Sequence, residues 1–257
     1  MQPQLVAHRG WPARYPENTL VGYEAVIAAG ARFIETDVQL TADGVPVLYH
    51  DRTLARVSAR PGAVHQYDWT ALRRFAAFEF ERFGYRFART PIARLAELAD
   101  LLQRHAEVTA FVEIKRISVE RFGADAVARK VLPLLEPLRG RCVVISYDPG
   151  VLLAVRERGW LEIGAVVDHW RQRRARRITA LRPQYLFCGI RSLPRWRRAR
   201  WEYGRIGVFE TSDPALARWA ARRGAALVET DDWGGLAGAL WPGRGPVLPP
   251  APVPAPG

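Results

Sequence analysis

A regular alternation of two kinds of segment runs along most of the sequence. Short apolar runs, several of them rich in β-branched residues, predict strands at residues 5–8, 33–40, 109–116, 142–146, 162–167, 185–188, 206–210 and 226–230. Patterns with a period near 3.6 predict helices at residues 19–30, 92–105, 124–138, 150–158, about 170–180, about 193–203 and 213–223. Counting one βα unit for each predicted strand gives eight units. The pattern predicts an α/β fold, a (β/α)8 TIM barrel, whose active site would lie where the strands end.

The stretch after the second predicted strand departs from this alternation. Thr-Ala-Asp-Gly at 41–44 predicts a hairpin turn, from which the chain returns through residues 45–51. Residues 52 to about 90 are aromatic and Arg-rich without a clear period, which predicts a small insertion. We therefore expect a single domain over residues 1–241, followed by a proline-rich disordered tail at 242–257.

A net charge of +12, from 38 Lys and Arg against 26 Asp and Glu, raises the question of a nucleic-acid partner. Only Lys115 and Lys130 are lysines, and Ala, Pro and Gly are abundant as well. Because Arg, Ala, Pro and Gly all have GC-rich codons, coding bias explains the charge more simply, and a nucleic-acid role is disfavoured. The clusters at 171–177 and 191–201 are typical of solvated helix faces, although attraction of anionic substrates or lipid surfaces stays open.

Two further features bear on the compartment. Cys142 and Cys188 lie far apart in apolar surroundings, which predicts buried thiols rather than a disulfide. The first residues lack the pattern of a signal peptide, and no apolar run is long enough to span a bilayer. These features predict a cytoplasmic protein, and nothing in the pattern fixes an oligomeric state.

Carboxylates recur at matching positions of two neighbouring strands. Glu35 and Asp37 are two residues apart, so the pleat directs both side chains to one face, and Glu113 and Lys115 repeat this spacing. Carboxylates at a barrel's open end repel each other unless a cation lies between them, and Mg2+ or Ca2+ prefers such oxygen ligands. Solvated strand ends paired with arginine are the alternative. The matching position of Glu113 favours a site for one divalent metal ion.

Two histidines and an arginine also end predicted strands. His8 closes the first strand, with Arg9 beside it, and His50 closes the return strand of the hairpin. Imidazoles titrate near neutrality, so two of them beside a metal ion suit a general base and a general acid. The planar guanidinium of Arg9 suits a phosphate or a carboxylate. These residue types together fit metal-assisted attack on a phosphodiester.

Six short motifs follow one another between residue 5 and about residue 116. They are His-Arg-Gly at 8–10, Pro-Glu-Asn-Thr at 16–19, Glu-Thr-Asp at 35–37, Thr-x-Asp-Gly at 41–44, His-Asp at 50–51 and Glu-Ile-Lys at 113–115. Each is weak alone, but their order and spacing resemble the glycerophosphodiester phosphodiesterase family, and a weaker likeness continues through 228–232. The resemblance implies metal-dependent hydrolysis of deacylated phospholipids such as glycerophosphocholine, with release of an alcohol and sn-glycerol 3-phosphate. The alternative is the same barrel acting on lysophospholipids or another phosphodiester.

The resemblance also implies a role for each matching residue. Glu35, Asp37 and Glu113 would be the metal ligands, and His8 and His50 would form the acid/base pair. Arg9 and Lys115 would bind the phosphate, and Asn18 would support the first loop. Where many members of the family carry Trp-Thr-x-Asn near the seventh strand, this chain has Phe-Glu-Thr-Ser at 209–212. Because of this difference, the resemblance does not identify the residues that form the pocket for glycerol or for the alcohol. Glu210 and Asp231 are placed either to reach the active site or to pair with an arginine.

Some choices stay open at this point. The nucleophile is either water or the neighbouring glycerol hydroxyl, and three carboxylates suit Mg2+ and Ca2+ equally. Aromatic residues of the insertion either contact the alcohol portion of the substrate or pack, and packing is favoured; they are Tyr67, Trp69, Phe75, Phe78 and Phe80.

Overall fold

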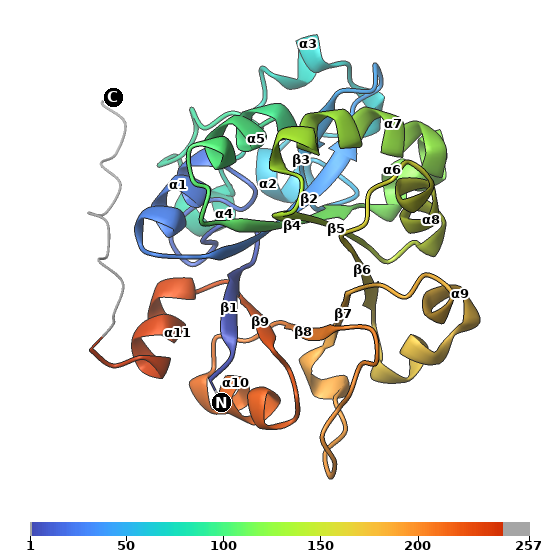
Figure 1. Cartoon of the computed structure of the whole chain (residues 1–257). Helices are drawn as coiled ribbons and strands as arrows, with labels where there is room; N and C mark the ends of the chain where they lie inside the picture. The colour runs from blue at the N-terminus through green and yellow to red at the C-terminus, as the bar shows by residue number, and fades with distance from the viewer. Residues whose placement is uncertain (1, 244–257) are drawn as a thin grey trace.

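The computed structural model describes residues 2–243, and in it eight parallel strands close into a barrel (Figure 1). The strands are β1 (Gln4–Ala7), β2 (Phe33–Leu40), β4 (Thr109–Ile114), β5 (Cys142–Ser146), β6 (Ile163–Val167), β7 (Tyr185–Gly189), β8 (Arg205–Phe209) and β9 (Leu227–Thr230). Each strand pairs with the next, and β1 pairs in parallel with both β9 and β2, which closes the ring. The predicted barrel is confirmed.

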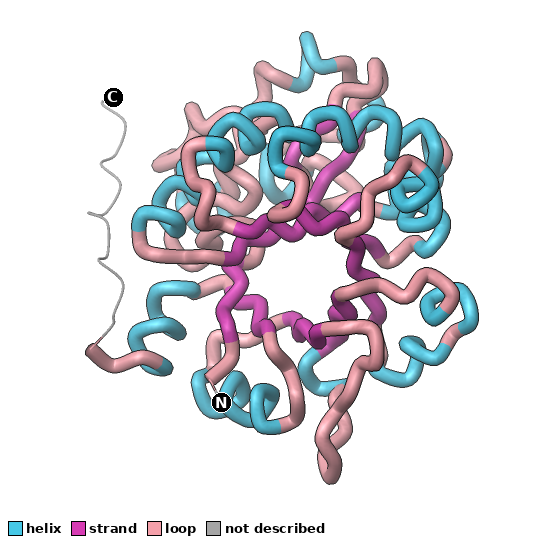
Figure 2. Tube along the Cα trace, in the orientation of Figure 1, coloured by secondary structure: helices cyan, strands magenta, loops and turns pink. Residues whose placement is uncertain are grey.

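Helices surround the ring of strands, as Figure 2 shows in cyan around magenta. They are α1 (Leu20–Ala28), α5 (Leu95–Gln103), α6 (Arg116–Phe122), α7 (Ala124–Leu135), α8 (Pro149–Glu157), α9 (Arg176–Thr179), α10 (Pro214–Arg222) and α11 (Trp233–Leu240). Short 3-10 turns join some of them, namely η2 (Glu136–Leu138), η3 (Trp170–Arg174) and η4 (Ile190–Ser192). Thr19 caps α1, because its side chain accepts from the amide of Gly22.

The hairpin after β2 also forms as the sequence predicts. β3 (Pro46–Leu48) pairs antiparallel with β2, and Gly44 adopts a φ of 79° in the turn between them. Short helices then follow within the predicted insertion: α2 (Ala55–Ser58), η1 (Val64–Gln66), α3 (Trp69–Leu72) and α4 (Phe80–Phe83). α2, η1 and α3 share a small apolar core with β3 that includes Val47, Leu54 and Ile92, whereas Phe83 of α4 packs on the main core.

Two apolar layers hold the barrel together. The larger layer lies between the strands and the helices. The smaller one fills the inside of the ring with Val6, Phe111, Val143, Ile145, Val166, Phe187 and Leu227. Gly207 makes room for this filling, because a Cβ there would lie 2.3 Å from the ring of Phe187. The ring is therefore a packed core, and open space remains at its end.

The helix predicted over residues 193–203 is wrong. This segment is irregular and connects η4 to the start of β8. A helix here would bring like charges three residues apart onto one face, as with Arg195 and Arg198, which disfavours it. The irregular path instead buries Trp201, whose indole Nε1 donates to the carbonyl of Pro183 at 2.8 Å.

The proline-rich tail predicted at 242–257 lies almost entirely outside the described residues. Cys142 and Cys188 are both buried free thiols, as predicted. Among residues 2–243 no helix combines the length and the apolar character needed to cross a bilayer.

Candidate active site

A small cavity lies at the carboxyl ends of the barrel strands, and we call this end of the barrel the mouth. The volume of the cavity is about 150 Å3. Its polar lining consists of His8, Arg9, Glu35, His50, Glu113, Lys115, Glu210 and Glu229, and its apolar lining of Ile145, Tyr147, Val166, Phe187 and Phe209. Most of the sequence-predicted site residues therefore face one space.

Three carboxylates meet at the mouth as the strand register requires. Asp37 lies opposite Glu113 in the β2–β4 pair, and Glu35 lies two residues before Asp37 on the same face. One oxygen from each of the three buried side chains lies within 4.8 Å of the others. Lys115 joins them, with its Nζ 3.0 Å from Asp37 Oδ1 and 2.9 Å from Glu113 Oε1.

These buried charges perturb each other strongly. Burial, together with the nearby Asp37, raises the pKa of Glu35 well above its ordinary value. Burial also raises the pKa of Glu113, against the effect of Lys115. Although burial acts to raise it, Lys115 and then Arg9 hold the pKa of Asp37 far below its usual range. The three acidic side chains offer carboxylate oxygens as metal ligands, and such oxygens fit a hard divalent cation such as Mg2+ or Ca2+.

Arg9 is fixed by both its backbone and its side chain. Its φ of 54° and the φ of 92° at Gly10 turn the chain sharply after β1, and its amide donates to Glu35 Oε2 at 3.1 Å. The guanidinium lies 3.1 Å from Asp37 Oδ2 through Nε and 3.4 Å from Glu17 through Nη1. The planar fork is thus held at the edge of the acidic cluster, where it is largely buried.

Asn18 orients Asp37 from behind. Its Nδ2 donates to Asp37 Oδ2 at 2.9 Å, and its Oδ1 accepts from the Asp37 amide at 3.1 Å. The same Oδ1 accepts from the hydroxyls of Thr36 and Tyr23, each at 3.0 Å. This buried amide therefore fixes the Asp37 carboxylate, a role other than the predicted support of the first loop.

His8 reaches the mouth from β1 and meets acidic partners across the closure of the barrel. Its Nδ1 lies 2.8 Å from Asp231 Oδ1 and 2.8 Å from Glu210 Oε2, and its Nε2 lies 3.9 Å from Glu35 Oε2. Burial and Arg9 act to lower the pKa of His8, but the bonds to Asp231 and Glu210 outweigh them, so the pKa is raised well above its ordinary value. Both late carboxylates thus reach the mouth rather than pairing with a distant arginine.

His50 lies on the rim of the mouth and is held from the side of the insertion. Its Nδ1 lies 2.8 Å from Asp51 Oδ1, and Arg56 contacts the same carboxylate at 2.7 Å and 2.9 Å. Arg56 also bonds Glu17 at 2.7 Å and 2.9 Å, and Glu17 in turn contacts Arg9. We call this chain from His50 to Arg9 the rim network.

Sequence reasoning missed the inner members of this network. Glu17 and Asp51 lie inside quoted motifs, so their presence near the site had a signal. Arg56 and Glu79 lie in a segment without periodicity and had none. Glu79 accepts from the amide of Glu17 at 2.7 Å and lies 2.7 Å from Arg82, so it anchors the network to the insertion.

Glu229 is a further lining residue that the sequence reasoning missed. It lies on β9, is 4% exposed, and faces the inside of the barrel like Leu227 two residues earlier. Burial raises its pKa to about 8, with the charge of Glu113 adding to this effect against that of His8. The period-2 pattern of the last strand is the signal that could have placed it inside.

The barrel and its mouth by themselves define a class of proteins. It is a closed parallel barrel in which buried carboxylates, two imidazoles and two cations face one small cavity, a set suited to binding an anion and moving protons. A family model described as the glycerophosphoryl diester phosphodiesterase family matches residues 8–193. The chain belongs to this family, as its motifs predict.

Individual relatives agree with this assignment. A glycerophosphodiester phosphodiesterase of Bacillus altitudinis is 32% identical over 153 residues, which are 58% of this chain and 60% of that protein. The chain thus spans about three fifths of the length of that relative. A solved structure of this family from Silicibacter pomeroyi has a TM-score of 0.80 at 21% identity, with 95% of this chain and 94% of that chain covered. A phosphodiesterase from Oleispira antarctica, solved with the product sn-glycerol-3-phosphate, has a TM-score of 0.74 at 21% identity and covers 90% and 93%.

Proposed function

We propose that this protein hydrolyses glycerophosphodiesters, the deacylated phospholipids such as glycerophosphocholine, to an alcohol and sn-glycerol 3-phosphate. One observation carries the proposal: a single small cavity is lined by carboxylates, two histidines, an arginine and a lysine at the mouth of the barrel. Membership of the phosphodiesterase family supports it. The product held by the Oleispira antarctica relative is the product expected here.

The size of the cavity favours a deacylated substrate over a lysophospholipid. Cavities that hold ligands of drug size have volumes of about 300–1,000 Å3. The mouth cavity has about 150 Å3, which suits a phosphate with a small alcohol on each side. Its apolar wall, formed by Tyr147, Phe187 and Phe209, is short and lies against the strands. An acyl chain would have to lie outside it.

Glu35, Asp37 and Glu113 would hold one divalent metal ion, Mg2+ or Ca2+. The fit rests on three buried carboxylates that converge within 4.8 Å. When bound, the ion would offset the charge of the nonbridging phosphate oxygens. Asn18 and Lys115 keep Asp37 in place through their own bonds to it, so the carboxylate is already oriented.

The remaining residues supply phosphate binding and proton transfer. Arg9 and Lys115 would bind the phosphate, the first as a fork and the second as a point charge. Of the two imidazoles, one would take a proton from the nucleophile, either water or the glycerol hydroxyl, and the other would return a proton to the leaving oxygen. Asp231 and Glu210 orient His8, and Asp51 orients His50. Each histidine thus has a carboxylate partner that fixes its ring.

The aromatic residues of the insertion are not part of this cavity. Tyr67, Trp69 and Phe75 pack on the small core of the insertion, Phe78 packs on the main core, and Phe80 is 42% exposed beside Tyr85. The favoured packing role therefore fits these side chains better than contact with the alcohol.

The test is release of glycerol 3-phosphate from glycerophosphocholine by purified protein with Mg2+, with Ca2+ and with EDTA. We expect release with at least one of the ions, loss of release in EDTA, and loss in Glu35→Gln. Glu24→Gln, an exposed residue of α1, is the matched control and should retain full activity. Activity that survives both EDTA and Glu35→Gln would overturn the metal-dependent mechanism.

A further inference from the structure

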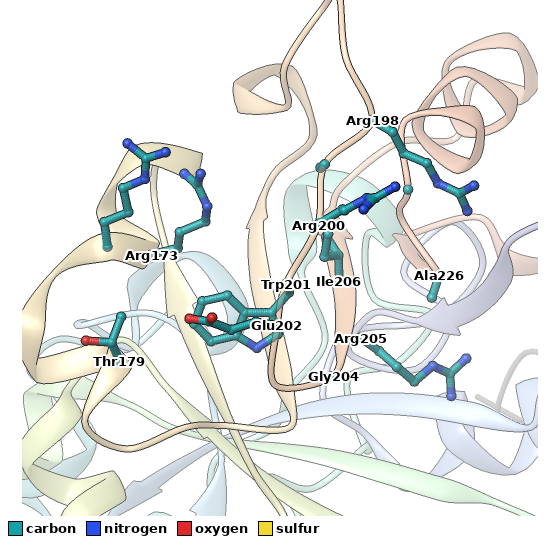
Figure 3. Close-up of a pocket in the computed structure, with 13 residues that line it drawn as sticks. Arg173, Thr179, Arg198, Arg200, Trp201, Glu202, Gly204, Arg205, Ile206 and Ala226 are labelled. Carbon is teal, nitrogen blue, oxygen red and sulfur yellow. The ribbon is translucent and has the colours of Figure 1, made fainter.

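A second charged region lies away from the mouth cavity, where two hollows are lined by arginine. The first has about 650 Å3 and is shown in Figure 3, where Arg173 lies on one side and Arg198, Arg200 and Arg205 lie on the other. The second hollow has about 420 Å3 and shares Arg173 and Arg174 with the first. We call the arginine surface the set Arg171, Arg173, Arg174, Arg195, Arg197, Arg198, Arg200 and Arg205, together with Trp196.

Positive charge is largely uncompensated on this surface. Among the residues that line the two hollows, Glu202 of the first hollow is the acidic one. Within residues 2–243, Arg171, Arg174 and Arg197 have no ion-pair partner. Burial and then the neighbouring Arg174 and Arg197 lower the pKa of Arg173. Guanidinium groups that repel each other in this way favour an anion between them.

A fully exposed tryptophan lies within the same segment. Trp196 is 93% exposed, more than any other large apolar side chain of the described residues. It belongs to the irregular segment that replaces the predicted helix, the orange loop extending from the lower edge of the barrel in Figure 1. Arg195 and Arg197 flank it in sequence and are exposed too. An indole that is held in water beside cations has the composition of an interfacial anchor.

We propose that the arginine surface docks the protein on membranes that contain anionic phospholipids. Trp196 enters the interface between headgroups and acyl chains, while the arginines contact lipid phosphates. The inference does not depend on the proposed phosphodiesterase activity. Most residues of the arginine surface lie on two segments, residues 168–184 after β6 and residues 190–204 after β7. Each segment begins at the carboxyl end of its strand, on the same rim as the mouth.

The aromatic geometry favours a lipid surface over a nucleic acid. Sequence-tolerant binding of single strands uses several exposed rings on which successive bases stack. Here Trp170 and Trp201 are buried, and the guanidinium of Arg173 covers the ring of Trp170 at 4.2 Å. Of the tryptophans in the described residues of this surface region, Trp196 is the exposed one. One anchor ring among arginines suits insertion into an interface rather than a stacking platform.

Vesicle sedimentation of the full chain tests this proposal. We expect binding to phosphatidylcholine vesicles that contain phosphatidylglycerol, little binding to pure phosphatidylcholine, and release at high salt. Arg195→Ser with Arg197→Ser should lower partition by at least about tenfold, since each arginine near an anionic surface contributes about fivefold. Trp196→Ser should lower it several-fold and should remove the blue shift of tryptophan emission that vesicles induce in the wild type.

Matched variants on the opposite edge of the barrel control for net charge and for apolar surface. Arg73 and Arg74 are exposed next to α3, and Tyr85 is 77% exposed. Arg73→Ser with Arg74→Ser, and Tyr85→Ser, should bind vesicles like the wild type. Equal losses in these controls would reduce the effect to net charge and overturn the proposal. So would absent vesicle binding, or binding to a single-stranded oligonucleotide that displaces vesicles and depends on Trp196.

Discussion

The mouth and the arginine surface both contain cationic side chains, but these are paired and buried at the mouth and largely exposed on the arginine surface. At the mouth, Arg9 and Lys115 are largely buried, and each is held by carboxylates at about 3 Å. On the arginine surface, Arg171 and Arg174 are exposed and lack such partners among the described residues. The paired cations have a fixed position, which chemistry on a phosphate requires, whereas the exposed ones provide a broad positive field.

The comparison also shows how each setting follows from the fold. Strand ends of a parallel barrel converge, so acids and bases from β1, β2, β4 and β9 meet around one small cavity. Most of the arginine surface lies on connections outside the ring, where water can solvate exposed guanidinium groups such as those of Arg171 and Arg174. Substitutions should therefore have large effects at the mouth and small ones on the arginine surface.

The largest effect is expected at His8. If it transfers a proton, His8→Ala should lower kcat for glycerophosphocholine by about 10²–10⁴-fold. The exposed His169, which lies near the arginine surface, provides the matched control. His169→Ala should retain wild-type kcat. A comparable loss of kcat in both variants would contradict a specific role of His8 in proton transfer.

Removal of a paired cation should destabilise the fold, and removal of an unpaired one should not. Lys115→Met leaves Asp37 and Glu113 without their shared partner, so we expect a loss of about 3–5 kcal/mol in the free energy of unfolding. Arg174→Met should change it by at most about 0.5 kcal/mol. Urea denaturation of both variants measures the difference. Equal changes would contradict the contrast between the two regions.

The rim network offers a smaller and more selective effect. Arg56→Met breaks the link between Asp51 and Glu17, so His50 and Arg9 lose their mutual orientation, and kcat should fall by up to about 10²-fold. Arg52→Met changes an exposed neighbour whose ion-pair partner among the described residues is Glu120, and it is the control. Steady-state kinetics on both variants checks this. An Arg56 variant with unchanged kcat would show that His50 needs no such support.

The smallest effect is a change in the titration of His8. Asp231 raises the pKa of His8, so Asp231→Asn should lower it, as followed by NMR of the imidazole protons. The folded-state pKa lies above the ordinary value, so the protonated ring stabilises the fold below about pH 6.5. This contribution is lost as the pH rises through the folded pKa. An unchanged titration in Asp231→Asn would remove Asp231 from this role.

Much of the fold could be predicted because its signals are local. Strand runs, the Asp-Gly turn and the helix beginning at Thr19 each depend on a few adjacent residues. The helix expected at 193–203 was wrong because its apolar spacing competes with repulsion among its arginines and with burial of Trp201. Such a balance depends on tertiary contacts that periodicity does not contain.

The site divides in the same way. His8 follows β1, whereas Glu35, Asp37 and Glu113 lie in motifs within β2 and β4, and their convergence follows from the parallel register. Glu229 could not be placed as readily, since its approach to the cavity depends on closure of β9 onto β1 across the whole chain. Arg56 likewise depends on the path of the insertion.

The most direct test of the proposed activity is a 31P NMR spectrum of glycerophosphocholine incubated with the protein and Mg2+ or Ca2+. We predict that the substrate signal is replaced by that of glycerol 3-phosphate, and that EDTA prevents the change. No conversion by folded protein that binds the ion, or conversion to phosphocholine instead, would contradict the proposed reaction at the mouth.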